Sequence, residues 1–229
     1  MKLFVRISLF GLLLSGALYA ASLRYIDRFP PTHEMLTNLE NEPVQEPIDL
    51  GPFTFEYRGS EYMVRPRYAY ELWGLVVSQN DISSITDSYH NSDSVDFKDL
   101  CVVWGENLDA NLLNRMQFWS EPWTCFGKPK DGAAQREFSW TQLSNNHILS
   151  RREEVRSLLS DVHRGDQIQL KGMLVDYADK RYPSNFRRTS TVRTDTGNGA
   201  CEVFFVEAAK VLKVANPAWR QVYKVSRAG

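Results

Sequence analysis

The chain has 229 residues, of which 43% are hydrophobic, and a formal net charge of -1. Residues 25–229 are long enough for one domain with its own core, and they carry 24 basic against 28 acidic side chains once Lys2, Arg6 and Arg24 are set aside. A general nucleic-acid binder is normally basic, so this balance weighs against a nucleic-acid partner.

An apolar segment opens the chain. Lys2 and Arg6 precede an uncharged run over residues 7–23, which as a helix spans roughly 25 Å, near the short end of what crosses a bilayer. Positive residues before an apolar run are typical of an export signal, which places the rest of the chain in the periplasm or outside the cell. Because residues 17–22 fit a signal-peptidase site poorly, we expect residues 1–24 to be a single-pass anchor in the inner or plasma membrane. Secretion after signal cleavage and a buried helix of a cytosolic domain are the alternatives.

Residues 25–52 contain five prolines, and this composition predicts an extended spacer. We expect a single mostly β globular domain over residues 53–214 and a flexible tail over 215–229. The polar stretches 79–99 and 178–200 predict surface loops. Strands are predicted at residues 53–57, 61–65, 68–78, 100–104, 117–119, 123–126, 167–177, 201–206 and 210–214.

One soluble helix is predicted. Ser150 and Glu154 are placed to cap its start, and apolar residues recur at helical spacing as far as Val162. Gly172, inside the strand over 167–177, predicts a bend or β-bulge. Several short strands with one helix before a late strand favour a mainly β fold, a small bent antiparallel barrel of OB-like type. A β-sandwich and an irregular α+β domain are the alternatives.

The three cysteines are Cys101, Cys125 and Cys201. In an oxidising compartment the simplest arrangement is one disulfide and one free thiol, and three pairings are open. The alternative is three separate buried thiols, because cysteine is among the most buried residue types.

A polar, glycine-containing segment covers residues 187–202. Its glycines expose backbone N–H groups, and Arg187, Arg188, Arg193 and Asn198 are candidate ligand-binding residues for an anion. The structural alternative is a turn stabilised by its own Asp and Asn side chains. The spacing matches neither a phosphate loop nor a dinucleotide fingerprint.

Residues 192–202 read VRTDTGNGACE. Together with residues 70–77, 100–105 and 143–147, this segment resembles a family of uncharacterised bacterial membrane-associated or exported proteins. The resemblance covers most of residues 55–213. No activity is assigned to that family, so the resemblance implies no catalytic residue and no function.

Cys201, His147 and Asp195 are the weak catalytic candidates. A cysteine hydrolase needs an imidazole to take the thiol proton and a carboxylate to orient the imidazole. Cys201 begins a predicted strand and so lacks the help of a helix N-terminus. The four histidines are isolated and there is no Cys-x-x-Cys pair, so we expect neither a metal nor another cofactor.

The aromatic residues of the predicted strands serve either as core or as a groove that stacks sugars or bases. The sequence as a whole favours a membrane-tethered extracytoplasmic binding or accessory domain without catalysis. Its expected partners are the membrane, through the N-terminal helix, and a protein, a glycan or an anionic ligand. The first alternative is a hydrolase with a site near His147, Arg193, Asp195 and Cys201. The second is an OB-like binder of single-stranded nucleic acid or another polyanion.

Overall fold

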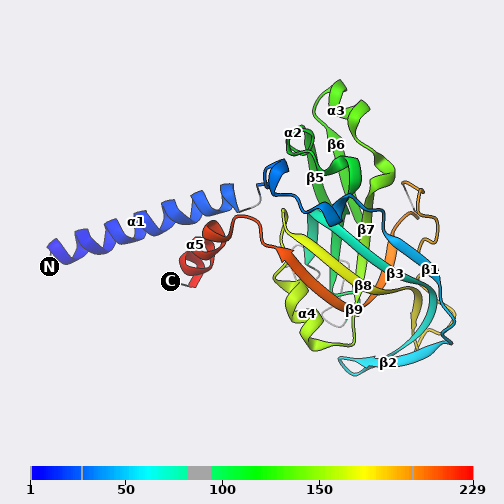
Figure 1. Ribbon diagram of the computed structural model, residues 1–229. Helices are drawn as coiled ribbons and strands as arrows, with labels where there is room; N and C mark the ends of the chain where they lie inside the picture. The colour runs from blue at the N-terminus through cyan, green and yellow to red at the C-terminus, as the bar shows by residue number, and fades with distance from the viewer. Residues whose placement is uncertain (1, 27, 82–93, 198, 229) are drawn as a thin grey trace.

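The computed structural model describes residues 2–26, 28–81, 94–197 and 199–228. The fold is mainly β, with one long N-terminal helix and several short ones (Figure 1). The elements, in chain order, are α1 (Lys2–Tyr25), η1 (Thr32–Glu34), η2 (Thr37–Glu40), β1 (Val44–Pro47), β2 (Phe53–Tyr57), β3 (Ser60–Asp81), β4 (Lys98–Val103), η3 (Gly105–Leu108), α2 (Ala110–Asn114), β5 (Met116–Glu121), β6 (Thr124–Pro129), α3 (Gly132–Glu137), η4 (Trp140–Gln142), β7 (Leu143–Leu149), α4 (Glu153–Ser160), β8 (Gln167–Asp179), β9 (Glu202–Lys213) and α5 (Pro217–Ala228).

Five strands pair in a closed ring, in the order β3, β4, β7, β9, β8 and back to β3. The pairs are antiparallel except for β7 and β9, which run parallel. Strand β3 closes the ring because it is long enough to pair with β8 along most of its length and with β4 near its end. Helix α4 lies between β7 and β8 in the chain, and its Val155 and Leu159 share one apolar cluster with Leu72, Leu170 and Phe204 of the strands.

Each predicted strand overlaps an observed one, four of them extend one residue beyond it, and two pairs of them are joined. Residues 61–65 and 68–78 form one strand, β3, with a register shift between Pro66 and Tyr68, and residues 201–206 and 210–214 merge into β9. Gly172 lies at a register shift between β8 and β9, where a Cβ atom would overlap the carbonyl oxygen of Phe205.

Strand β7 is one of the elements that the sequence does not predict. Its central residues are Asn145, Asn146 and His147, and asparagine is depleted in strands. All three are buried, because β7 lies between β4 and β9 in the ring and faces neighbouring structure on both sides.

The chain between β4 and β7 forms a layer over the outer side of the ring. The hairpin of β5 and β6 belongs to this layer, and Phe118 of β5 packs into one apolar cluster with Val103 of β4. A disulfide joins Cys101 of β4 to Cys125 of β6, and Cys201 is a free thiol. The hairpin is therefore covalently tied to the strand beneath it.

The segment 25–52, predicted as an extended spacer, packs on the domain, and the predicted flexible tail 215–229 contains a helix. Phe29 and Leu39 are buried against the domain, and β1 pairs with β3, because the segment 25–52 contains enough apolar residues to pack. Residues 217–228 form helix α5 beside α1 (Figure 1), where Tyr25 stacks on Trp219 with ring centroids 4.7 Å apart.

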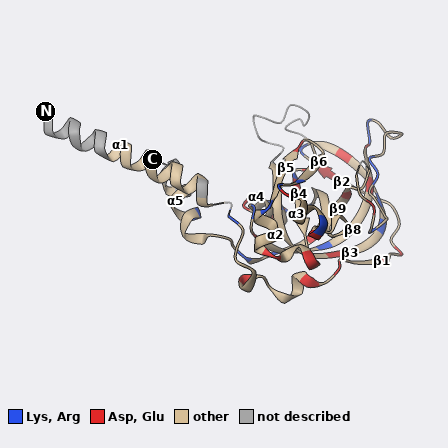
Figure 2. Ribbon diagram, turned by 90° about the horizontal axis from the view of Figure 1, so that it is seen from above, with Lys and Arg blue, Asp and Glu red and all other residues tan. Residues whose placement is uncertain are grey.

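Asn216 holds the two flanking segments together. Its side-chain Nδ2 donates to the carbonyl oxygens of Ile26, at 3.1 Å, and Arg28, at 2.7 Å. Arg220 pairs with the buried Asp166 at 2.5 Å, which fixes the start of α5 to the domain. Helix α1 projects away from the ring (Figure 2). Within the described residues, none of the helices combines the length and the apolar character needed to span a bilayer.

Candidate functional site

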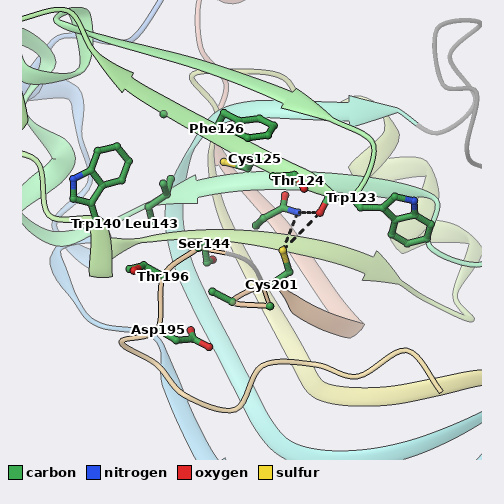
Figure 3. A pocket seen from close by; sticks show the side chains of 15 residues that line it. Trp123, Thr124, Cys125, Phe126, Trp140, Leu143, Ser144, Asp195, Thr196 and Cys201 are labelled. Carbon is green, nitrogen blue, oxygen red and sulfur yellow. Dashed lines mark hydrogen bonds between the residues drawn. The ribbon is translucent and has the colours of Figure 1, made fainter.

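A pocket of about 710 Å³ lies between β6, the start of β7 and the loop that precedes β9 (Figure 3). Figure 3 shows Trp123 and Trp140 toward opposite ends of this pocket, with Cys201 between them. Among the described residues that line it there is no Lys or Arg. The lining residues are Trp123, Thr124, Cys125, Phe126, Gly127, Trp140, Leu143, Ser144, Asn145, Asp195, Thr196, Gly197, Gly199, Ala200 and Cys201.

His147 and Asp99 form a buried pair behind the pocket. They are direct partners in the antiparallel ladder of β7 and β4, so their side chains project from the same face of the sheet. Nδ1 of His147 lies 2.6 Å from Oδ1 of Asp99, and both side chains have an exposed fraction of 0%. The ladder therefore fixes the orientation of the imidazole, with Nε2 turned away from Asp99.

Cys201 stands between this pair and the pocket. Its thiol donates to the main-chain oxygen of Trp123 over 3.7 Å, and Nδ2 of Asn145 donates to its sulfur over 3.6 Å (Figure 3). The parallel pairing of Asn146 with Glu202 places Cys201, one residue earlier, beside Asn145. His147 is the next residue of β7 on the same face as Asn145, because side chains alternate between the two faces of a strand.

These contacts determine the protonation of His147. Burial by itself lowers its pKa, but the hydrogen bond with Asp99 and the neighbouring thiol of Cys201 outweigh burial and raise the pKa to about 9. Arg187 opposes the second proton on the ring through charge repulsion. Its Nη2 lies 2.8 Å from Nε2, and since a guanidinium can only donate, Arg187 and a proton compete for that nitrogen.

Trp123 covers the pair from outside. It occupies the two-residue turn between β5 and β6 with a φ of 71°, in a region that normally requires glycine. Its ring lies 3.5 Å from the guanidinium carbon of Arg187 and 5.5 Å from the ring of His147. Such backbone strain costs on the order of 1–3 kcal/mol and is concentrated at functional sites.

The structure separates the other candidate residues. The partner of His147 is Asp99, and Asp195 instead accepts a hydrogen bond from Ser190 Oγ at 2.5 Å and lines the pocket. Asp99 is the last residue of the predicted loop 79–99, and no motif distinguishes it from the other acidic residues there. Residues 82–93 of that loop lie outside the described part of the chain.

The arginines expected to bind an anion do not converge. Arg193 turns inward, where it pairs with the buried Glu202 at 2.7 Å and donates to the hydroxyl of Tyr70. Burial raises the pKa of Glu202 to about 7, against the lowering effect of Arg193. Arg188 is exposed and lines no part of the pocket, and Asn198 lies outside the described residues.

Within the described ranges of the chain, no group of three or more His, Cys, Asp or Glu side chains is arranged to hold a metal ion. Comparison of the chain with protein-family models, with curated proteins and with solved structures finds no match. Its function has to be argued from the geometry of the site.

Proposed function

We propose that this protein is a membrane-tethered, extracytoplasmic binding domain with an OB-like barrel, and that its pocket binds a neutral saccharide. The observation that carries the ligand class is the lining of the pocket, in which Trp123 and Trp140 lie near Asn145 and Asp195, with no cationic side chain among the lining residues that the structure describes. Aromatic faces pack on the apolar faces of a sugar ring, and amide and carboxylate groups bond to its hydroxyls.

The strand order supports the OB-like assignment. An OB fold is a five-stranded Greek-key barrel that binds its ligands on the face of its second and third strands and with the loop between its fourth and fifth. In the ring, β4 and β7 take the second and third positions, and residues 180–201 connect β8 to β9. The pocket lies at that loop and at β7.

Charge favours a neutral ligand over a polyanion. Asp195 adds a negative charge to the pocket, whereas Arg193 is committed to Glu202 and Arg187 is stacked on Trp123. Among the described residues of the pocket wall, a polyanion would meet a carboxylate and no cation, which disfavours its binding.

The N-terminal segment supports the tether. Lys2 and Arg6 precede the uncharged run 7–23 in the order of an export signal. A disulfide between Cys101 and Cys125 is consistent with an oxidising compartment. If the full-length protein stays in alkali-washed membranes and its domain is digested by protease added from outside the cytoplasm, the tether holds. Recovery of a soluble cytoplasmic protein would refute it.

Ligand binding is tested with the full-length protein in detergent on an array of neutral glycans, acidic glycans and oligonucleotides. We expect neutral glycans to bind and Trp140→Ala to weaken binding about tenfold, as loss of one aromatic contact predicts. Tyr182→Ala removes an exposed aromatic side chain outside this pocket and serves as the matched control. Binding of oligonucleotides alone, with a steep salt dependence, would overturn the ligand class.

A further inference from the structure

An ion pair fixes the segment that forms one wall of the pocket. Asp195 and Thr196 line the pocket from the loop that precedes β9 (Figure 3). Two residues before Asp195, Arg193 pairs with Glu202 over 2.7 Å. We propose that this ion pair positions Asp195 and Thr196 in the pocket wall, and that the pocket releases its ligand when Glu202 takes up a proton. This inference adds regulation to the saccharide site and rests on the proposed function.

Glu202 and Arg193 connect the loop to the ring of strands. Glu202 is the first residue of β9, pairs in register with Asn146 of β7 and is 1% exposed. Nη1 of Arg193 also donates to the hydroxyl of Tyr70 in β3 over 3.0 Å, and its guanidinium carbon lies 5.2 Å from the ring centroid of Trp104. Because the side chain of Arg193 reaches into the ring, its backbone and the residues that follow it are held close to the strands.

The base of the same loop is held by contacts that do not involve Glu202. The main-chain N–H of Ser190 donates to the carbonyl oxygen of Cys201 over 2.9 Å, and Oγ of Ser190 donates to Oδ2 of Asp195 over 2.5 Å. Neither bond depends on the charge of Glu202, so the loop stays attached at its base when the ion pair is lost. Loss of the ion pair therefore loosens the pocket wall without unfolding the loop.

The charge of Glu202 depends on pH near neutrality. Burial, with a smaller contribution from the charge of Asp195, raises its pKa to about 7 against the lowering effect of Arg193. Tyr70 of β3 and Glu42 also belong to this group of interacting residues. Burial and the charges of Glu202 and Glu42 raise the pKa of Tyr70, so its phenol stays neutral across the range in which Glu202 titrates.

Proton uptake by Glu202 removes one of the two charges of the pair. A guanidinium cannot lose its proton in a protein, and 21% of the Arg193 side chain is exposed. A charge that stays in the interior after its partner is neutralised is strongly unfavourable, whereas water is within reach of this side chain. Arg193 therefore turns outward when Glu202 is neutral. Asp195 and Thr196 then lose the position that binds the ligand, and the affinity of the pocket falls.

The first test measures binding to the full-length protein in detergent, with the neutral glycan that binds most tightly on the array. If only ionised Glu202 allows binding, about 90% of the protein is competent at pH 8 and about 10% at pH 6, so the affinity should fall by up to about ninefold. Glu202→Gln cannot ionise and should bind with one affinity at both pH values, below that of the wild type at pH 8. Glu207→Gln, in the same strand and with a side chain that is 45% exposed, should keep the wild-type profile. Equal wild-type affinities at pH 6 and pH 8, or a pH-dependent Glu202→Gln, would overturn the proposal.

Trypsin cleavage tests the ion pair without a ligand or a variant, and so also decides the case in which Glu202→Gln does not fold. The full-length wild type is digested at about pH 6 and at about pH 8, and the initial rate of cleavage after Arg193 is divided by the rate after Arg188, an exposed residue of the same loop. Because trypsin cuts both sites in one digest, its own pH dependence cancels. Release of Arg193 from Glu202 should raise this ratio severalfold at the lower pH.

The two measurements separate this inference from the proposed function. If the cleavage ratio is the same at both pH values, the ion pair does not respond to pH and the proposal fails, whatever the array shows. If the ratio rises and no neutral glycan binds at either pH, the saccharide function fails and the response of the ion pair to pH stands.

Discussion

The raised pKa of His147 makes the stability of this protein depend on pH. The imidazole binds its second proton more tightly in the folded chain, where the pKa is about 9, than in the unfolded chain, where it is near 6.5. The stabilisation is therefore fully present below pH 6.5 and is lost as the pH rises through 9. A shift from 6.5 to about 9 corresponds to about 3 kcal/mol of unfolding free energy.

Urea unfolding followed by tryptophan fluorescence measures this effect. Between about pH 6 and pH 10 we expect the unfolding free energy of the wild type to fall by up to about 3 kcal/mol more than that of Asp99→Asn, which lacks the carboxylate that holds the proton. The variant is the control because lysines and tyrosines that titrate near the upper limit contribute equally to both proteins. If the two curves are parallel across this range, His147 does not carry the raised pKa and the reasoning is wrong.

Three further predictions concern single positions. Gly172→Ala places a Cβ atom against the carbonyl oxygen of Phe205 and should lower the unfolding free energy by about 1–3 kcal/mol, whereas Gly51→Ala, with open space around its Cβ, should have little effect in the same urea experiment. Because the pKa of Glu202 is about 7 in the fold against 4.5 as its usual value, its contribution to stability is present below pH 4.5 and is lost through pH 7, and Glu202→Gln should remove that decline. Arg187→Ala removes the positive charge beside Nε2 and should raise the pKa of His147 further, and equal His147 pKa values for Arg187→Ala and Arg188→Ala in an NMR titration would contradict this role.

Local pattern was sufficient for part of the fold. Helix α4 and the strand that contains Gly172 were predictable, because periodicity and a backbone requirement are both encoded over a few residues. The helix ends at Ser160 instead of near Val162, and its N-cap is Arg152 instead of Ser150. Strand β7 was not predictable, because Asn145, Asn146 and His147 are polar and their burial depends on partners in β4 and β9 that lie far away in the chain.

The same distinction applies to the site. Cys201 and His147 were candidates because few residue types accept or lose a proton near neutral pH. The sequence favours Asp195 as the carboxylate beside them, because Asp195 is close to Cys201 in the chain. The actual partner, Asp99, is adjacent to His147 only through the pairing of β4 with β7. Likewise, the three arginines of the loop had the composition of an anion site, but Arg193 is drawn inward by the buried charge of Glu202.

Asn216 and Arg220 affect how the domain is oriented relative to α1. A single covalent connection between a helix and a domain allows the helix to rotate about that connection. The bonds from Asn216 to the carbonyl oxygens of Ile26 and Arg28 add a second attachment at the same place, which opposes this rotation. These bonds therefore restrain the direction of α1 relative to the ring of strands. A chain cut before Asn216 should keep its ring of strands and lose this restraint.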